Sequence, residues 1–77
     1  MKEYKYNATQ AIFEALTGGR KLSQMDCREF EVEDMRTPIS HMKERIDNAG
    51  FNLHTRWIQT PKGRRIKEYW LERRTLS

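Results

Sequence analysis

The chain has 77 residues, of which 36% are hydrophobic and 34% are charged, and its formal net charge is +4. A chain of this length buries only about 60% of its unfolded surface, which leaves little room for an enclosed catalytic pocket. The lone Cys27 excludes an intrachain disulfide, and no apolar stretch approaches the ~20 residues that span a bilayer. We therefore expect a cytoplasmic protein without enzymatic activity, membrane contact or small-molecule substrate. Residues 1–77 are expected to form one domain, with residues 1–6 and 73–77 as flexible tails.

Positive charge is concentrated in the C-terminal part of the chain. Residues 1–55 carry eight of the 15 Lys and Arg residues and nine of the 11 Asp and Glu residues. The remaining seven basic residues lie in residues 56–77, against two acidic ones. This asymmetry indicates either a polyanion partner for the C-terminal part or a basic surface that serves solubility.

A first helix is predicted over residues 8–16, where apolar residues recur on one face. Asn7 or Thr9 can cap it, since a short side-chain oxygen accepts hydrogen bonds from the first turn. Glycine tolerates the left-handed backbone that closes a helix, so Gly18-Gly19 is expected to end it.

A second, short helix is predicted over residues 24–30. Ser23 and Asp26 match the capping-box pattern, in which a hydroxyl residue and an acid three positions later cap one another's backbone. The residues expected to point inward are Met25 or Leu22, together with Cys27 and Phe30.

A third helix is predicted over residues 37–49, with Thr37 as its N-cap and Pro38 at the first helical position. Gly50 is the expected terminator. The buried stripe consists of Ile39, Met42, Ile46 and Ala49, which recur at helical spacing.

The period then changes to two. Residues 51–58 and 64–71 alternate as strands, and residues 60–63 have turn chemistry. A three-residue loop would place Ile58 opposite Ile66 and Arg56 opposite Glu68. A two-residue loop would instead place Trp57 opposite Ile66 and Leu53 opposite Trp70. We favour the three-residue loop because it sets opposite charges across from each other.

This α+β pattern of helix, helix, helix and hairpin is that of a three-helix winged helix-turn-helix with a C-terminal two-stranded β-hairpin wing. Residues 9–71 resemble small winged helix-turn-helix DNA-binding domains of bacteria and phages. The stretches that carry the resemblance are Ser23-Gln24-Met25-Asp26, Ile39 to Ile46, Asn48-Ala49-Gly50-Phe51, Trp57-Ile58, Gly63-Arg64-Arg65 and Glu68-Tyr69-Trp70-Leu71.

The resemblance implies sequence-specific binding of double-stranded DNA by a small transcriptional regulator or an accessory factor of DNA transactions. Helix 37–49 would enter the major groove and wing 58–66 would lie on the backbone. The base contacts would come from Ser40, His41, Glu44 and Thr37, whose side chains can donate to or accept from base edges. The phosphate contacts would come from Arg36, Lys43, Lys62, Arg64 and Arg65.

A second hypothesis is a winged-helix module that binds a host protein, favoured by the acidic run over residues 29–34. Whether the chain forms a homodimer is left open. Trp57 and Trp70 are expected to pack in the core, because a small domain needs large apolar side chains there. No cofactor and no metal are expected, since Cys27, His41 and His54 lack the spacing of a zinc site.

Overall fold

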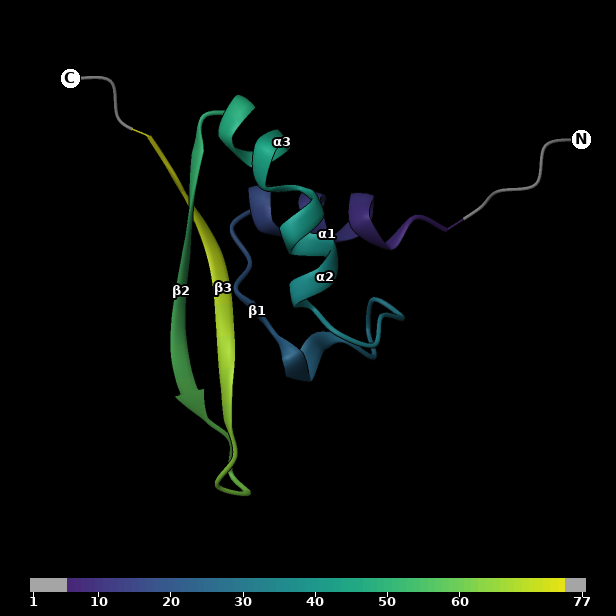
Figure 1. Cartoon of the computed structure of the whole chain (residues 1–77), viewed down its shortest axis with the longest axis vertical. Coiled ribbons are helices and arrows are strands. Elements are labelled where there is room, and N and C mark those ends of the chain that lie inside the picture. The colour runs from purple at the N-terminus through teal and green to yellow at the C-terminus, as the bar shows by residue number, and fades with distance from the viewer. Residues whose placement is uncertain (1–5, 75–77) are drawn as a thin grey trace, which may run out of the picture.

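The computed structural model describes residues 6–74, which form a small α+β domain with three α-helices and a three-stranded antiparallel sheet (Figure 1). The elements are α1 (Ala8–Thr17), β1 (Leu22–Ser23), the 3₁₀ helix η1 (Gln24–Asp26), α2 (Arg36–His41), α3 (Lys43–Asn48), β2 (Phe51–Gln59) and β3 (Arg65–Arg73). The sheet order is β1-β3-β2. The predicted α+β class is confirmed, and β2 and β3 form the predicted C-terminal hairpin, to which β1 adds a third strand that was not predicted.

The first helix begins at Ala8 as predicted and ends at Thr17, one residue later than predicted. Asn7 caps α1, its Oδ1 accepting from the N–H of Gln10 at 3.1 Å. Gly18 is the C-cap, and Gly19 follows in the left-handed region with φ +97°. Glycine meets this requirement without strain.

The capping box at Ser23 and Asp26 is confirmed, but the predicted helix over residues 24–30 is shortened to η1. Hydrogen-bonded turns follow η1, and they end at Glu31, whose φ is +56°. A helix of two turns is too short to be stable on its own, so the conformation of this segment is determined by its contacts with the rest of the domain. The inward residue is Leu22, fully buried, rather than Met25, which is 64% exposed.

The helix predicted over residues 37–49 instead begins at Arg36 and is divided at Met42, whose φ and ψ are −103° and 6°. The N–H of Met42 is shared between the carbonyls of Pro38 and Ile39, each at 3.2 Å, which tightens the turn.

Thr37 is therefore not the N-cap, and Pro38 lies at the third helical position, two residues further inside than expected. Two side chains accept hydrogen bonds from the free N–H groups at the start of the helix. Asp34 accepts from the N–H of Arg36 at 2.9 Å, and Gln24 accepts from the N–H of Met35 at 2.6 Å. Asp34 lies just before the helix, where acceptor side chains are favoured.

Three members of the predicted stripe, Ile39, Met42 and Ile46, are buried, whereas Ala49 is exposed. Gly50 has φ +86° and terminates the helical segment after α3, as predicted. The core consists of Ile12, Leu16, Leu22, Phe30, Met35, Ile39, Met42, Ile46 and Tyr69.

The hairpin has the register of the three-residue loop. Ile58 pairs with Ile66 and Arg56 with Glu68. Beyond the strands, the N–H of Thr60 still donates to the carbonyl of Arg64 at 2.7 Å, which leaves residues 61–63 at the tip. An ion pair of 2.7 Å joins the side chains of Arg56 and Glu68, as the charge argument predicts.

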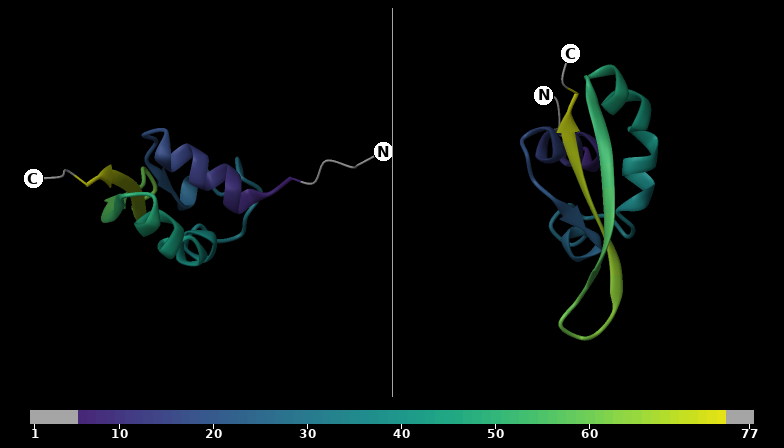
Figure 2. Two further views of the ribbon diagram at one scale, coloured as in Figure 1. Left: turned by 90° about the horizontal axis from the view of Figure 1, so that it is seen from above. Right: turned by 90° about the vertical axis from the view of Figure 1, so that its left-hand side faces the viewer.

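The hairpin projects well beyond the helices, and its turn lies far from them in Figure 1 and in the right-hand view of Figure 2. Trp57 lies on this projecting part and is 58% exposed, so its predicted burial is wrong. Trp70 is half-buried on the other face of the hairpin, where it stacks on His54 with ring centroids 5.7 Å apart.

Three residues of the expected tails have defined contacts. The hydroxyl of Tyr6 donates to the carbonyl of Phe30 at 3.0 Å. Arg73 lies in β3 opposite Phe51, and the N–H of Arg74 donates to the carbonyl of Gly50 at 2.9 Å. Residues 1–5 and 75–77 of those tails lie outside the described residues.

Replacement of Ile46 by Ala is expected to lower the free energy of unfolding by about 2–5 kcal/mol, because the side chain is fully enclosed. Urea denaturation followed by circular dichroism measures this loss. Asn48→Ala, an exposed position in the same helix, is the control and should change stability by less than about 0.5 kcal/mol. Equal effects of the two substitutions would contradict the assigned core.

Candidate functional site

The start of α2 presents a shallow hollow of about 280 Å³. We call it the α2 hollow, and its lining residues are Asp34, Arg36, Thr37, Ser40 and His41. Three of the four predicted base contacts thus lie together, and all three are exposed. Their hydroxyl and imidazole groups can donate to or accept from polar atoms of a ligand.

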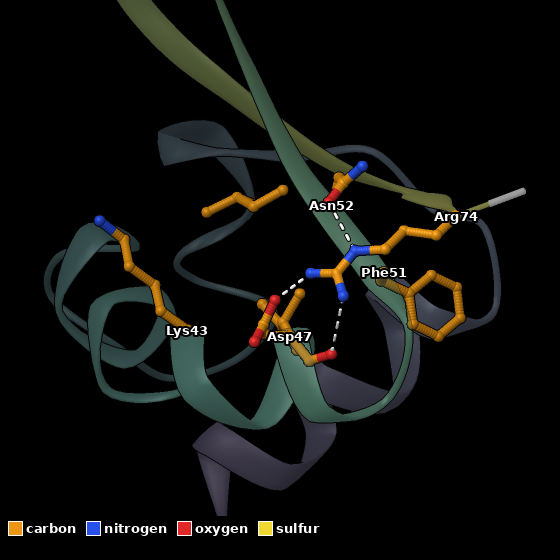
Figure 3. Close-up of a pocket in the computed structure, with 7 residues that line it drawn as sticks. Lys43, Asp47, Phe51, Asn52 and Arg74 are labelled. Atoms are coloured by element: carbon orange, nitrogen blue, oxygen red, sulfur yellow. Dashed lines mark hydrogen bonds and ion pairs between the residues drawn. The ribbon is translucent and has the colours of Figure 1, made fainter. Parts of the chain in front are cut away.

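The other two predicted contacts on this helical segment, Lys43 and Glu44, lie beyond the break at Met42, on α3. Both are exposed, and neither lines the α2 hollow. Lys43 lines a different hollow, of about 310 Å³, together with Asp47 and Arg74 (Figure 3). In that view its ammonium group stands apart from the Asp47–Arg74 pair.

Arg74 neutralises the acidic end of α3. Its guanidinium forms an ion pair with the carboxylate of Asp47 and donates to Oδ1 of Asn52 at 2.9 Å (Figure 3). The same guanidinium approaches the main-chain carbonyl of Asp47 at 3.5 Å, where a cation complements the negative end of a helix. No sequence pattern predicts this contact, since it joins the residue after β3 to α3.

A third hollow, of about 330 Å³, lies between the start of α2 and the hairpin. We call it the α2–hairpin groove. Its lining includes four cations, Arg36, Arg64, Arg65 and Lys67, together with Trp57 and Tyr69, and no carboxylate of the described residues. Three of the predicted phosphate contacts are therefore brought together here. Lys62 is exposed in the turn beyond the groove.

Trp57 and Lys67 are members of this groove that the sequence analysis missed. Alternation places Trp57 on the face that carries Leu53, which suggests burial. The sequence feature that indicates the exposure of Trp57 is the length of the strand relative to the helices. A nine-residue strand extends about 30 Å, whereas the 13 residues from Arg36 to Asn48 extend about 20 Å as helix, so the strand must overhang its cover.

Arg36 lines both the α2 hollow and the α2–hairpin groove and thereby joins them into one continuous surface. Its side chain is 73% exposed and forms an ion pair with Asp34 at 3.0 Å. The hydrogen bond between them lowers the pKa of the Asp34 carboxyl below its ordinary value and raises the pKa of the Arg36 guanidinium. Asp34 is thus the one acid that the surface carries among its lining residues.

The acidic run lies on the loop that leads into α2. Glu29 is paired with Arg20 at 2.7 Å, and this contact lowers the pKa of its carboxyl. Glu31 and Glu33 are exposed and form no ion pair with any described residue. These two carboxylates are available to a partner.

Other kinds of site are not found in the described part of the chain. Between residues 6 and 74, no group of three or more His, Cys, Asp or Glu side chains is arranged to hold a metal ion. None of the helices described has the length and apolar character needed to cross a membrane. Burial raises the pKa of the Cys27 thiol, which disfavours the reactive thiolate.

Comparison of the chain with family models, curated proteins and solved structures gives no match.

Proposed function

We propose that the chain is a winged helix-turn-helix domain that binds double-stranded DNA sequence-specifically and catalyses no reaction. The observation that carries the proposal is the surface joined by Arg36, where a polar helix face adjoins a cationic groove free of lining carboxylates. The order helix, strand, helical turn, helix and hairpin, with β1 beside β3, supports the winged-helix assignment. A small phage or bacterial regulator, or an accessory factor of DNA transactions, is the role that fits the sequence resemblance and a cytoplasmic location.

In this proposal the segment from Arg36 to Asn48 enters the major groove, which is about 12 Å wide and admits one helix. Thr37, Ser40 and His41 then meet base edges as donors or acceptors. Glu44, further along, accepts from a cytosine amine, the usual base contact of a carboxylate in that groove.

The hairpin supplies the sequence-independent part of the affinity. Lys62, Arg64 and Arg65 lie at or near its projecting turn and are exposed. Each cation that neutralises a phosphate releases a counterion, which makes binding weaken as salt rises. Arg36 extends this contact towards the helix, although its pairing with Asp34 offsets part of its charge.

Binding to mixed-sequence duplex DNA is expected to fall steeply with salt, with a slope of about 0.9 log unit per phosphate contact. The triple variant Lys62→Ala, Arg64→Ala, Arg65→Ala should weaken binding to all sequences alike and reduce that slope by about 2–3. Fluorescence anisotropy at several salt concentrations measures both quantities. Arg73→Ala, which removes a cation at the far end of β3, is the control and should leave the slope unchanged. A wild-type protein that binds no duplex even at low salt would contradict the proposal.

Base recognition is expected to depend on the α2 hollow. The variant Thr37→Ala, Ser40→Ala, His41→Ala should fold normally, because all three side chains are exposed and Thr37 does not cap the helix. It should keep its affinity for scrambled DNA but lose about 1–3 kcal/mol of preference for a selected site per lost base contact. The selected site comes from enrichment of a random duplex library with wild-type protein. Full retention of the preference would remove these residues from base recognition.

A second candidate function is a winged-helix module that binds a host protein, and the exposed carboxylates of Glu31 and Glu33 favour it. Such a partner would present a basic surface to the loop before α2. Absence of duplex binding at low salt would make this the better function.

A further inference from the structure

Trp57 is a large apolar side chain that the fold leaves open. The residue is 58% exposed, although Tyr69 on the same face of the sheet is almost fully buried. Within residues 6–74, its indole N–H forms no hydrogen bond, whereas that of Trp70 donates to Glu72 at 3.4 Å. A tryptophan normally buries 150–250 Å² and satisfies its N–H when it is enclosed. Both the ring and the donor are thus available to a ligand.

Two cations lie close to this exposed ring. The guanidinium of Arg65 lies 5.6 Å and the ammonium of Lys67 5.4 Å from the ring centroid. Arg36 and Arg64 line the same groove. Fixed positive charge beside an open aromatic ring calls for a ligand that carries both anionic and apolar parts.

We infer that the α2–hairpin groove is a subsite for the sugar-phosphate backbone of duplex DNA, in which Trp57 packs against a deoxyribose. The inference rests on the proposed function and adds an apolar contact to it. Deoxyribose presents apolar carbon between successive phosphates, so one backbone segment satisfies ring and cations together. The planar donors of Arg36, Arg64 and Arg65 suit phosphate oxygens. The indole N–H of Trp57 is a further donor to phosphate.

This contact has a thermodynamic signature that separates it from the charged contacts of the hairpin. Packing of a ring on a sugar releases no condensed counterion, so its contribution does not depend on salt. It also reads no base edge, so its contribution is the same for every duplex sequence. Loss of the ring should therefore weaken binding without changing either the salt slope or the sequence preference.

The test compares Trp57→Ala and Trp57→Phe with wild-type protein on mixed-sequence duplex DNA at several salt concentrations. Trp57→Ala is expected to weaken binding about tenfold at every salt concentration, with the slope retained. Trp57→Phe should recover most of that loss, because it keeps an aromatic ring. Both variants should melt as wild type does, since the side chain is outside the core. An unchanged affinity of Trp57→Ala, with wild type binding normally, would overturn this inference and leave the proposed function intact.

Intrinsic fluorescence supplies a second readout that does not depend on affinity. The variant Trp70→Phe keeps Trp57 as its one tryptophan, and Trp57→Phe keeps Trp70. Saturating duplex should quench or shift the emission of Trp70→Phe and leave that of Trp57→Phe unchanged. Emission from Trp57 that does not respond would overturn the inference. The inference would also be overturned if the protein bound a duplex with one bulged, unpaired nucleotide more tightly and this gain were lost in Trp57→Ala. The ring would then stack on a base instead of a sugar.

Discussion

The position of the hairpin depends on the pairing of β3 with a strand on each side. A two-stranded hairpin alone is marginally stable in water, and here β3 also pairs with β1, through Leu22 opposite Tyr69. Both of these residues are buried in the core. β1 is only two residues long, yet it fixes the direction in which the longer strands leave the helices. The α2–hairpin groove exists because that direction carries the hairpin past the start of α2.

The start of α2 combines a structural need with an electrostatic cost. Asp34 accepts from the first N–H of the helix and forms an ion pair with Arg36, so it steadies both the helix and the side chain that joins the two hollows. The same carboxylate places a negative charge beside a surface that we propose for a polyanion. A pair this exposed contributes little to stability, and salt screens it. A phosphate that approaches Arg36 therefore competes with Asp34 for the same guanidinium.

Local chemistry made much of the fold predictable. Asn7, the Ser23–Asp26 capping box and Gly50 act within a few residues of their own position, and the Arg56–Glu68 pair selected the correct hairpin register. The break at Met42 was not predictable, because a kink in a helix depends on tertiary packing. The pairing of β1 was not predictable either, because a strand of two residues is too short to show an alternating pattern. The N-cap of α2 is Met35 instead of the predicted Thr37, and the first N–H of the helix donates to the side chain of Asp34. Three cations of the α2–hairpin groove, Arg36, Arg64 and Arg65, are among the predicted contacts, whereas Lys67 and Trp57 are not. The exposure of Trp57 follows from the unequal lengths of strand and helix.

The central claim is that α2 and the hairpin form one surface for duplex DNA. Titration of ¹⁵N-labelled protein with a short duplex, followed by NMR amide shifts, tests it most directly. We expect the largest changes at residues 36–44 and 57–67, with little change in α1 or at residues 29–33. Changes that map to the acidic loop, with the hairpin amides unmoved, would contradict it.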